Sequence, residues 1–175
     1  MIEGEAGSCE IPAPFTPNGY EFVKRYNNKN INPVLNGFEA DYEKTMQPFK
    51  IKPLSTIKEG EEVLVCSSEV RDVFKNGWRA GRVGDSIEFK LQGSEIALMY
   101  RKSINKPAPV AYAILDGDEE RKIKLDANFE ENWGDKAYMA TIAHHIEDTE
   151  HSLKVVIEDA SECESDFYLI NVIGR

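Results

Sequence analysis

The stretch from Gly84 to Gly174 is a series of short segments in which apolar and polar residues alternate, separated by turn-forming residues. In IEFKL (87–91) and SLKVVI (152–157), apolar residues at every second position fall on one face. Because successive side chains of a strand point to opposite faces, this alternation predicts strands with one buried face. A succession of such strands predicts two antiparallel sheets packed face to face, an all-β sandwich.

Three pairs of these segments have the spacing of β-hairpins. In the first, Gln92 and Gly93 separate the strands of IEFKLQGSEIALMYR (87–101). In the second, VAYAIL (110–115) and RKIKL (121–125) flank the acidic turn DGDEE. In the third, two apolar segments flank the turn EDTE (147–150). We therefore expect three hairpins, followed by a largely buried last strand, and about eight to ten strands in all.

The length of 175 residues suits one core and predicts a single domain. Residues 1–19 contain six glycines and prolines, which predicts a lead segment or linker without regular structure. The sandwich domain is predicted over 20–175, with its clearest pattern over 70–174. Within it, the glycine-rich and charged segment 70–86 is interpreted as a loop.

The charge of the chain excludes some classes of partner. The sequence has 31 acidic and 21 basic residues, a formal net charge of -10, which disfavours nucleic acid and anionic membranes. No apolar stretch approaches the roughly 20 residues of a membrane helix, and the acidic start is unlike a signal peptide. We expect a soluble chain, either cytoplasmic or a fragment of a secreted protein.

The three cysteines, Cys9, Cys66 and Cys163, are odd in number and lack the close spacing of metal ligands. They predict neither a disulfide framework nor a metal site. Cys66, inside the apolar run VLVC, is expected to be a buried thiol, and a disulfide between Cys9 and Cys163 is left open.

Two short motifs are similar to those of a serine hydrolase. Gly84-Asp85-Ser86 matches the start of the nucleophile block of GDSL esterases, and Asp148 with His151 has the D-x-x-H spacing of their acid and base. A nucleophilic serine of this type lies on a turn from a strand into a helix, whereas Ser86 begins a predicted strand. The turn interpretation is favoured, and an ester hydrolase using Ser86, Asp148 and His151 is kept as an alternative.

Histidines and acidic residues supply weak metal candidates. His144 and His145 are adjacent, so in a strand they would face opposite sides and not share a metal. Asp116 and Asp118 lie in an acidic turn whose oxygens suit calcium, but the turn lacks the spacing of a dedicated calcium loop. A solvated hairpin tip is favoured, and no cofactor is expected beyond a structural calcium ion as an option.

The order of these elements resembles the galactose-binding-like jelly-roll domain that accompanies bacterial SGNH/GDSL-type hydrolases and other carbohydrate-active enzymes. The similarity covers roughly residues 70–174 and is carried by NGW (76–78), GDSIEFKLQGSEIALMY (84–100), WG (133–134), EDTEHSLKVVI (147–157) and FYLINVIG (167–174). Thr149 stands where this pattern usually has glycine. The resemblance implies a jelly-roll fold and a non-catalytic module whose partner is the catalytic domain of a parent chain.

Sugars bind by stacking on aromatic rings together with polar contacts, so loops that combine both are candidate sites. The candidate ligand-binding residues are Trp78, Arg79, Tyr100, Arg101, Asn132 and Trp133. The alternative is that Trp78 caps the core, Trp133 covers an edge and the arginines pair with surplus carboxylates.

These observations predict a non-catalytic carbohydrate-binding or accessory module of a larger SGNH-type esterase or glycan-acting protein. Its expected partners are a glycan or polysaccharide and a catalytic domain. Two alternatives remain open: the ester hydrolase described above, and a structural or protein-interaction domain without a small-molecule site.

Overall fold

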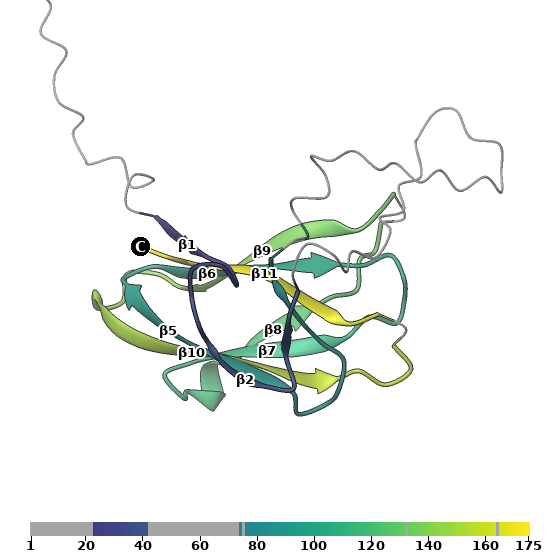
Figure 1. Ribbon diagram of the computed structural model, residues 1–175, viewed down its shortest axis with the longest axis horizontal. Helices are drawn as coiled ribbons and strands as arrows, with labels where there is room; N and C mark the ends of the chain where they lie inside the picture. Colours follow the sequence, from purple (N-terminus) through teal and green to yellow (C-terminus); the bar gives the residue numbers. More distant parts are fainter. Residues whose placement is uncertain (1–22, 42–73, 75, 132, 164) are drawn as a thin grey trace, which may run out of the picture.

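The computed structural model shows a two-layer β-sandwich, with the two sheets lying one above the other (Figure 1). The described residues are 23–41, 74, 76–131, 133–163 and 165–175. They contain eleven strands, one more than the upper end of the expected range of eight to ten. Three of these strands lie before Asp41 and are only two or three residues long. Every pair of neighbouring strands is antiparallel.

The larger sheet has six strands in the order β3-β4-β11-β6-β9, with β1 pairing to β11 beside β4. Its strands are β1 (Lys24–Tyr26), β3 (Glu39–Ala40), β4 (Trp78–Ala80), β6 (Ile96–Lys102), β9 (Lys136–Ala143) and β11 (Phe167–Gly174). Strand β9 forms one edge of this sheet and pairs with β6.

The smaller sheet has five strands in the order β2-β5-β10-β7-β8. Its strands are β2 (Val34–Asn36), β5 (Ser86–Gly93), β7 (Val110–Leu115), β8 (Ile123–Asp126) and β10 (Thr149–Asp159). A short 3-10 turn, η2 (Glu119–Arg121), connects β7 to β8.

The core between the sheets is formed by the alternating residues that the sequence pattern singles out. Fully buried side chains from both sheets meet there, including Ile87, Phe89 and Leu91 of β5 and Leu153, Val155 and Ile157 of β10. Each such side chain contributes about 1.5–3 kcal/mol when it is removed from water. The predicted all-β sandwich of jelly-roll type is therefore confirmed.

Strand β11 departs from strict alternation at a bulge. The register with β6 shifts between Leu169 and Asn171, and as a result Leu169 and Val172 both face the core although they are three residues apart. On the other face of β11, Tyr168 and Ile170 form a second small cluster with Phe74. This strand is therefore buried on both sides.

Two of the three expected hairpins are wrong. β5 pairs with β2 and β10, whereas β6 pairs with β9 and β11, so the connection at Gly93–Glu95 crosses from one sheet to the other. The connection between β9 and β10 crosses back in the same way. Alternation shows which face of a strand is buried but not to which sheet the strand belongs. The hairpin of β7 and β8 is confirmed.

The predicted loop over 70–86 contains β4, whose three residues pair with Phe167–Leu169 of β11. The predicted lead segment, residues 1–19, and two cysteines, Cys9 and Cys66, lie outside the described residues. Cys163 has a free thiol. No helix in the described part of the chain is long and apolar enough to cross a membrane.

Candidate functional site

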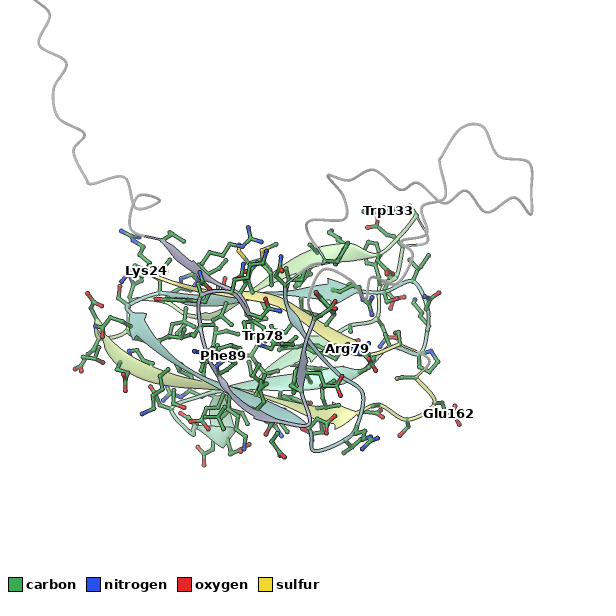
Figure 2. The ribbon with its side chains drawn as sticks, viewed as in Figure 1. Lys24, Trp78, Arg79, Phe89, Trp133 and Glu162 are labelled. Carbon is green, nitrogen blue, oxygen red and sulfur yellow. The ribbon has the colours of Figure 1, made fainter. Side chains whose placement is uncertain are left out.

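Trp133 is the more exposed of the two tryptophans and lies just before β9. Trp133 is 38% exposed, and its ring packs edge-on against that of Phe129 at a centroid distance of 5.4 Å. The indole N–H donates a hydrogen bond to the Glu131 carboxylate. Figure 2 shows Trp133 at the rim of the sandwich, away from the space between the sheets. The neighbouring candidate Asn132 lies outside the described residues.

Further aromatic and cationic side chains continue from Trp133 along the edge of the larger sheet. The Lys136 ammonium lies 5.4 Å from the Phe129 ring centroid. Lys102, opposite Lys136 in the register of β6 and β9, lies 4.8 Å from the ring centroid of Tyr138, which is 42% exposed. We call these five residues, Phe129, Trp133, Tyr138, Lys102 and Lys136, the aromatic edge.

Hydrogen bonds join the connection between β6 and β7 to the connection between β8 and β9, which carries Phe129 and Trp133. The Asp135 carboxylate accepts from the Ser103 hydroxyl at 2.9 Å and from the Ile104 N–H at 3.1 Å. The N–H of Phe129 donates to the Ser103 carbonyl oxygen at 3.0 Å. The side-chain oxygen of Asn128 accepts from the Ala108 N–H. The two loops are thus tied together beside the exposed rings, which lowers the ordering cost of binding.

The predicted ligand-binding residues Trp78 and Tyr100 are buried instead. Trp78 is 1% exposed and packs edge-on against Phe89 at 5.1 Å, between the two sheets (Figure 2). Tyr100 is 2% exposed, stacks on Phe167, and donates its hydroxyl to the Asp126 carbonyl oxygen. Burial raises the pKa of the Tyr100 hydroxyl. Neither ring is open to a ligand, because both fill the core.

Arg79 and Arg101 lie on the outer face of the larger sheet. The Arg79 guanidinium is 3.3 Å from the Glu39 carboxylate and 3.9 Å from that of Asp166. Arg101 donates to the Asp166 carbonyl oxygen and lies over the ring of Tyr168. Because neighbouring residues of a strand point to opposite faces, Arg101 and Lys102 of β6 point away from each other. The five predicted residues that the structure describes therefore do not converge on one site.

The candidate hydrolase triad is not assembled. In the register of β5 and β10, Ser86 lies opposite Val156 whereas His151 lies opposite Leu91. The serine is thus five strand positions from the histidine, roughly 17 Å. The Asp148 carboxylate accepts from the side-chain amide of Gln92 instead of facing His151. Ser86 therefore lacks the adjacent base that nucleophilic catalysis needs.

Asp116 and Asp118, the predicted calcium candidates, already accept hydrogen bonds from other groups of the chain. Asp116 accepts from the His151 ring and from the Ser152 N–H. Burial alone would raise the pKa of Asp116, but these hydrogen bonds hold it below its ordinary value. Asp118 caps η2 and pairs with Arg121, which lowers the pKa of Asp118. In the described ranges, no cluster of three or more histidine, cysteine, aspartate or glutamate side chains is arranged to hold a metal ion.

The adjacent histidines are also placed differently from the expectation. β9 ends at Ala143, so His144 and His145 lie in the connection after it. Both Nδ1 atoms approach the carboxylate of Glu95, at 2.8 and 3.5 Å. The two rings therefore share one partner instead of facing opposite sides of a strand, and a positive φ of 54° at His145 turns the backbone to allow it.

Taken together, the described residues form a jelly-roll domain with a partly exposed aromatic edge, whose loops are joined by hydrogen bonds, and with no assembled catalytic triad. No protein-family model matches the sequence, and no curated protein matches it. Two solved structures of a two-domain esterase (CEX) active on acetylated mannans are similar to this chain. The first, co-crystallised with mannopentaose, has 38% sequence identity and a TM-score of 0.73, and the match covers 94% of this chain and 39% of that one. The second has 39% identity and a TM-score of 0.72, and the match covers 93% and 38%.

This chain thus spans about two fifths of the length of the esterase chains that it matches. The chain is a jelly-roll accessory module of the kind that accompanies carbohydrate-active enzymes. The resemblance inferred from the sequence is therefore confirmed.

Proposed function

We propose that this chain is the glycan-binding module of a larger esterase that acts on acetylated polysaccharides, with an acetylated mannan as its first candidate ligand. The observation that carries this proposal is the 38% identity, over 94% of the chain, to part of a two-domain esterase active on acetylated mannans. Similarity at this level over almost the whole chain supports a shared role for the module. The proposal includes a catalytic domain as its partner in the parent protein.

The aromatic edge is the proposed contact surface for the glycan. A flat indole ring offers the C–H face of a pyranose a large apolar contact at low entropic cost. The hydrogen bond from Trp133 to Glu131 fixes the indole plane. Lys102 and Lys136 each have three N–H donors, so their ammonium groups are able to donate to sugar hydroxyls or to an acetyl carbonyl beside the rings. Binding then requires no covalent step.

The proposal is tested by affinity electrophoresis of this chain in gels that contain acetylated or deacetylated mannan. Trp133→Ala is expected to weaken retention at least about tenfold, the effect of losing a central aromatic contact. Met139→Ala is the matched control, because Met139 is 57% exposed on the same strand as Tyr138 but points to the opposite face. This control is expected to be retained like the unchanged chain.

Equal retention of Trp133→Ala and the unchanged chain would contradict the placement of the site at the aromatic edge. Absence of retention for the unchanged chain on a panel of mannans, xylans and cellulose would contradict glycan binding. That second outcome would favour the alternative of a protein-interaction domain that contacts the catalytic part of the parent enzyme.

A further inference from the structure

All three histidines of the chain lie in or next to the connection between β9 and β10. This connection, residues 144–148, crosses from the larger sheet to the smaller one at the end of β9 opposite to Trp133. It is tied to the neighbouring crossing connection, because the Ile146 N–H donates to the Ser94 carbonyl oxygen at 3.1 Å. The histidines therefore lie where the two sheets are joined.

His151 differs from the other two histidines because it is buried and has a partner at each ring nitrogen. Only 8% of the residue is exposed, and it occupies the same inward face of β10 as Leu153. Its Nδ1 is 2.7 Å from a carboxylate oxygen of Asp116, in the turn after β7. Its Nε2 is 2.8 Å from the backbone carbonyl oxygen of Glu147, within the 144–148 connection.

Both of these partners are hydrogen-bond acceptors. A neutral imidazole has one N–H and one lone pair, so it can satisfy only one of them. The imidazolium has two N–H groups and donates to both. In this geometry only the imidazolium donates to both acceptors at once, and loss of the proton would leave a ring lone pair facing an acceptor oxygen.

We propose that His151 is a protonation-dependent latch: its imidazolium bridges Asp116 and the Glu147 carbonyl oxygen and thereby holds the 144–148 connection against the end of the smaller sheet. When the ring loses its proton, the remaining N–H stays with the charged acceptor Asp116, and the bond to Glu147 is lost. The 144–148 connection is then no longer held to β10 through Glu147.

A second partner for the neutral ring is already in place. The Thr149 hydroxyl oxygen is 3.5 Å from His151 Nε2. A hydroxyl both donates and accepts, so it can turn its proton toward Nε2 once that nitrogen has become an acceptor. The latch therefore has two defined states, with the Glu147 carbonyl oxygen bound in one and the Thr149 hydroxyl bound in the other.

The charged surroundings of His151 favour its protonated state. Asp116 faces the ring from the turn after β7, Glu147 from the connection itself, and the opposite residue on β5 is the apolar Leu91. The hydrogen bond to Glu147 and the pair with Asp116 raise the pKa of His151 above its ordinary value of 6.5, although burial opposes them. Because the folded-state pKa is raised, the stabilisation is complete below about pH 6.5 and is lost as the pH rises through the folded-state pKa.

The test is an NMR titration of this chain, following the His151 ring nitrogens and the exchange of backbone amides, expressed as protection relative to intrinsic rates. We expect His151 to titrate above pH 6.5, its ordinary pKa. Protection of the Ile146 and Thr149 amides is expected to fall at least about tenfold as the pH passes through that titration, because local opening follows the lost anchor. Titration at or below the ordinary pKa, or protection that does not depend on pH, would overturn the proposal.

Two variants separate the latch from a general effect of charge. Asp116→Asn keeps an acceptor but removes its charge, so it is expected to move both the His151 titration and the loss of protection to lower pH. His144→Gln is the matched control, because His144 is an exposed histidine paired with Glu95 in the same region. It is expected to leave both curves unchanged, and an unchanged titration in Asp116→Asn would contradict the proposed pairing.

Discussion

The two tryptophans make the sharpest test of the architecture, because one lies in the core and the other at the rim. Trp78 is 1% exposed and is packed against Phe89, whereas Trp133 is 38% exposed. Replacing a buried tryptophan with alanine costs about 3–5 kcal/mol. Of this, about 0.5–1.5 kcal/mol comes from the lost edge-on aromatic pair. Trp78→Ala should therefore remove a large part of the 5–15 kcal/mol that typically stabilises a domain.

The measurement is urea unfolding followed by circular dichroism. With a slope of about 2 kcal/mol per molar urea, the loss for Trp78→Ala corresponds to a midpoint lowered by roughly 2 M. Trp133→Ala should lower the midpoint by less than about 0.5 M, since its ring remains partly in water. A cost below about 1 kcal/mol for Trp78→Ala, or a larger cost for Trp133→Ala, would refute the assignment of one ring to the core and the other to the surface.

Two further predictions concern the smaller sheet. Ser86→Ala should leave any hydrolysis of a short acyl ester by this chain unchanged, because Ser86 has no histidine beside it in the register of β5 and β10; loss of turnover in a colorimetric ester assay would contradict this. Asp126→Ala should lower the free energy of unfolding near pH 7 by no more than about 1 kcal/mol, since the half-exposed carboxylate is screened by solvent. Burial would raise the pKa of Asp126, but hydrogen bonds from Asn128 hold it below its ordinary value. The stabilisation is therefore present above about pH 3.9 and is lost as the pH falls through the lower folded-state pKa, so the unfolding curves of the two proteins should converge in acid.

The course of the chain between the two sheets could not be predicted from local pattern. The alternating residues of β5 and β6 were expected to face the core, and they do so. Their pairing was wrong because Gly93–Glu95 serves as a crossing between sheets and not as a hairpin turn. A short connection with glycine is compatible with both geometries. The choice depends on β10 and β11, which are distant in sequence and pair with β5 and β6 respectively.

The candidate site was predicted in part. Trp133 was identified because a tryptophan among polar residues and glycine is typical of an exposed loop. The other four residues of the aromatic edge were missed. Phe129 lies in the connection between β8 and β9, and Tyr138, Lys102 and Lys136 lie within strand patterns that give no sign of their position at a sheet edge. That Tyr138 is 42% exposed follows from the place of β9 at the edge of the larger sheet. Such a place is known only once all strands have been paired. The proposed boundary between a lead segment, 1–19, and the domain, 20–175, stays a prediction.

The amino-acid sequence alone determined that this chain is an all-β sandwich and which side chains face the core in the regularly alternating strands β5, β6 and β10, because the two-residue period of a strand is a local property that hydrophobic burial acts on directly. Only the tertiary structure decided which sheet each strand joins, that Trp78 fills the core while Trp133 stays exposed, and that His151 meets Asp116 instead of Ser86. These features depend on contacts between residues far apart along the chain. Their energies are settled by packing and register, and neither is encoded in any short segment.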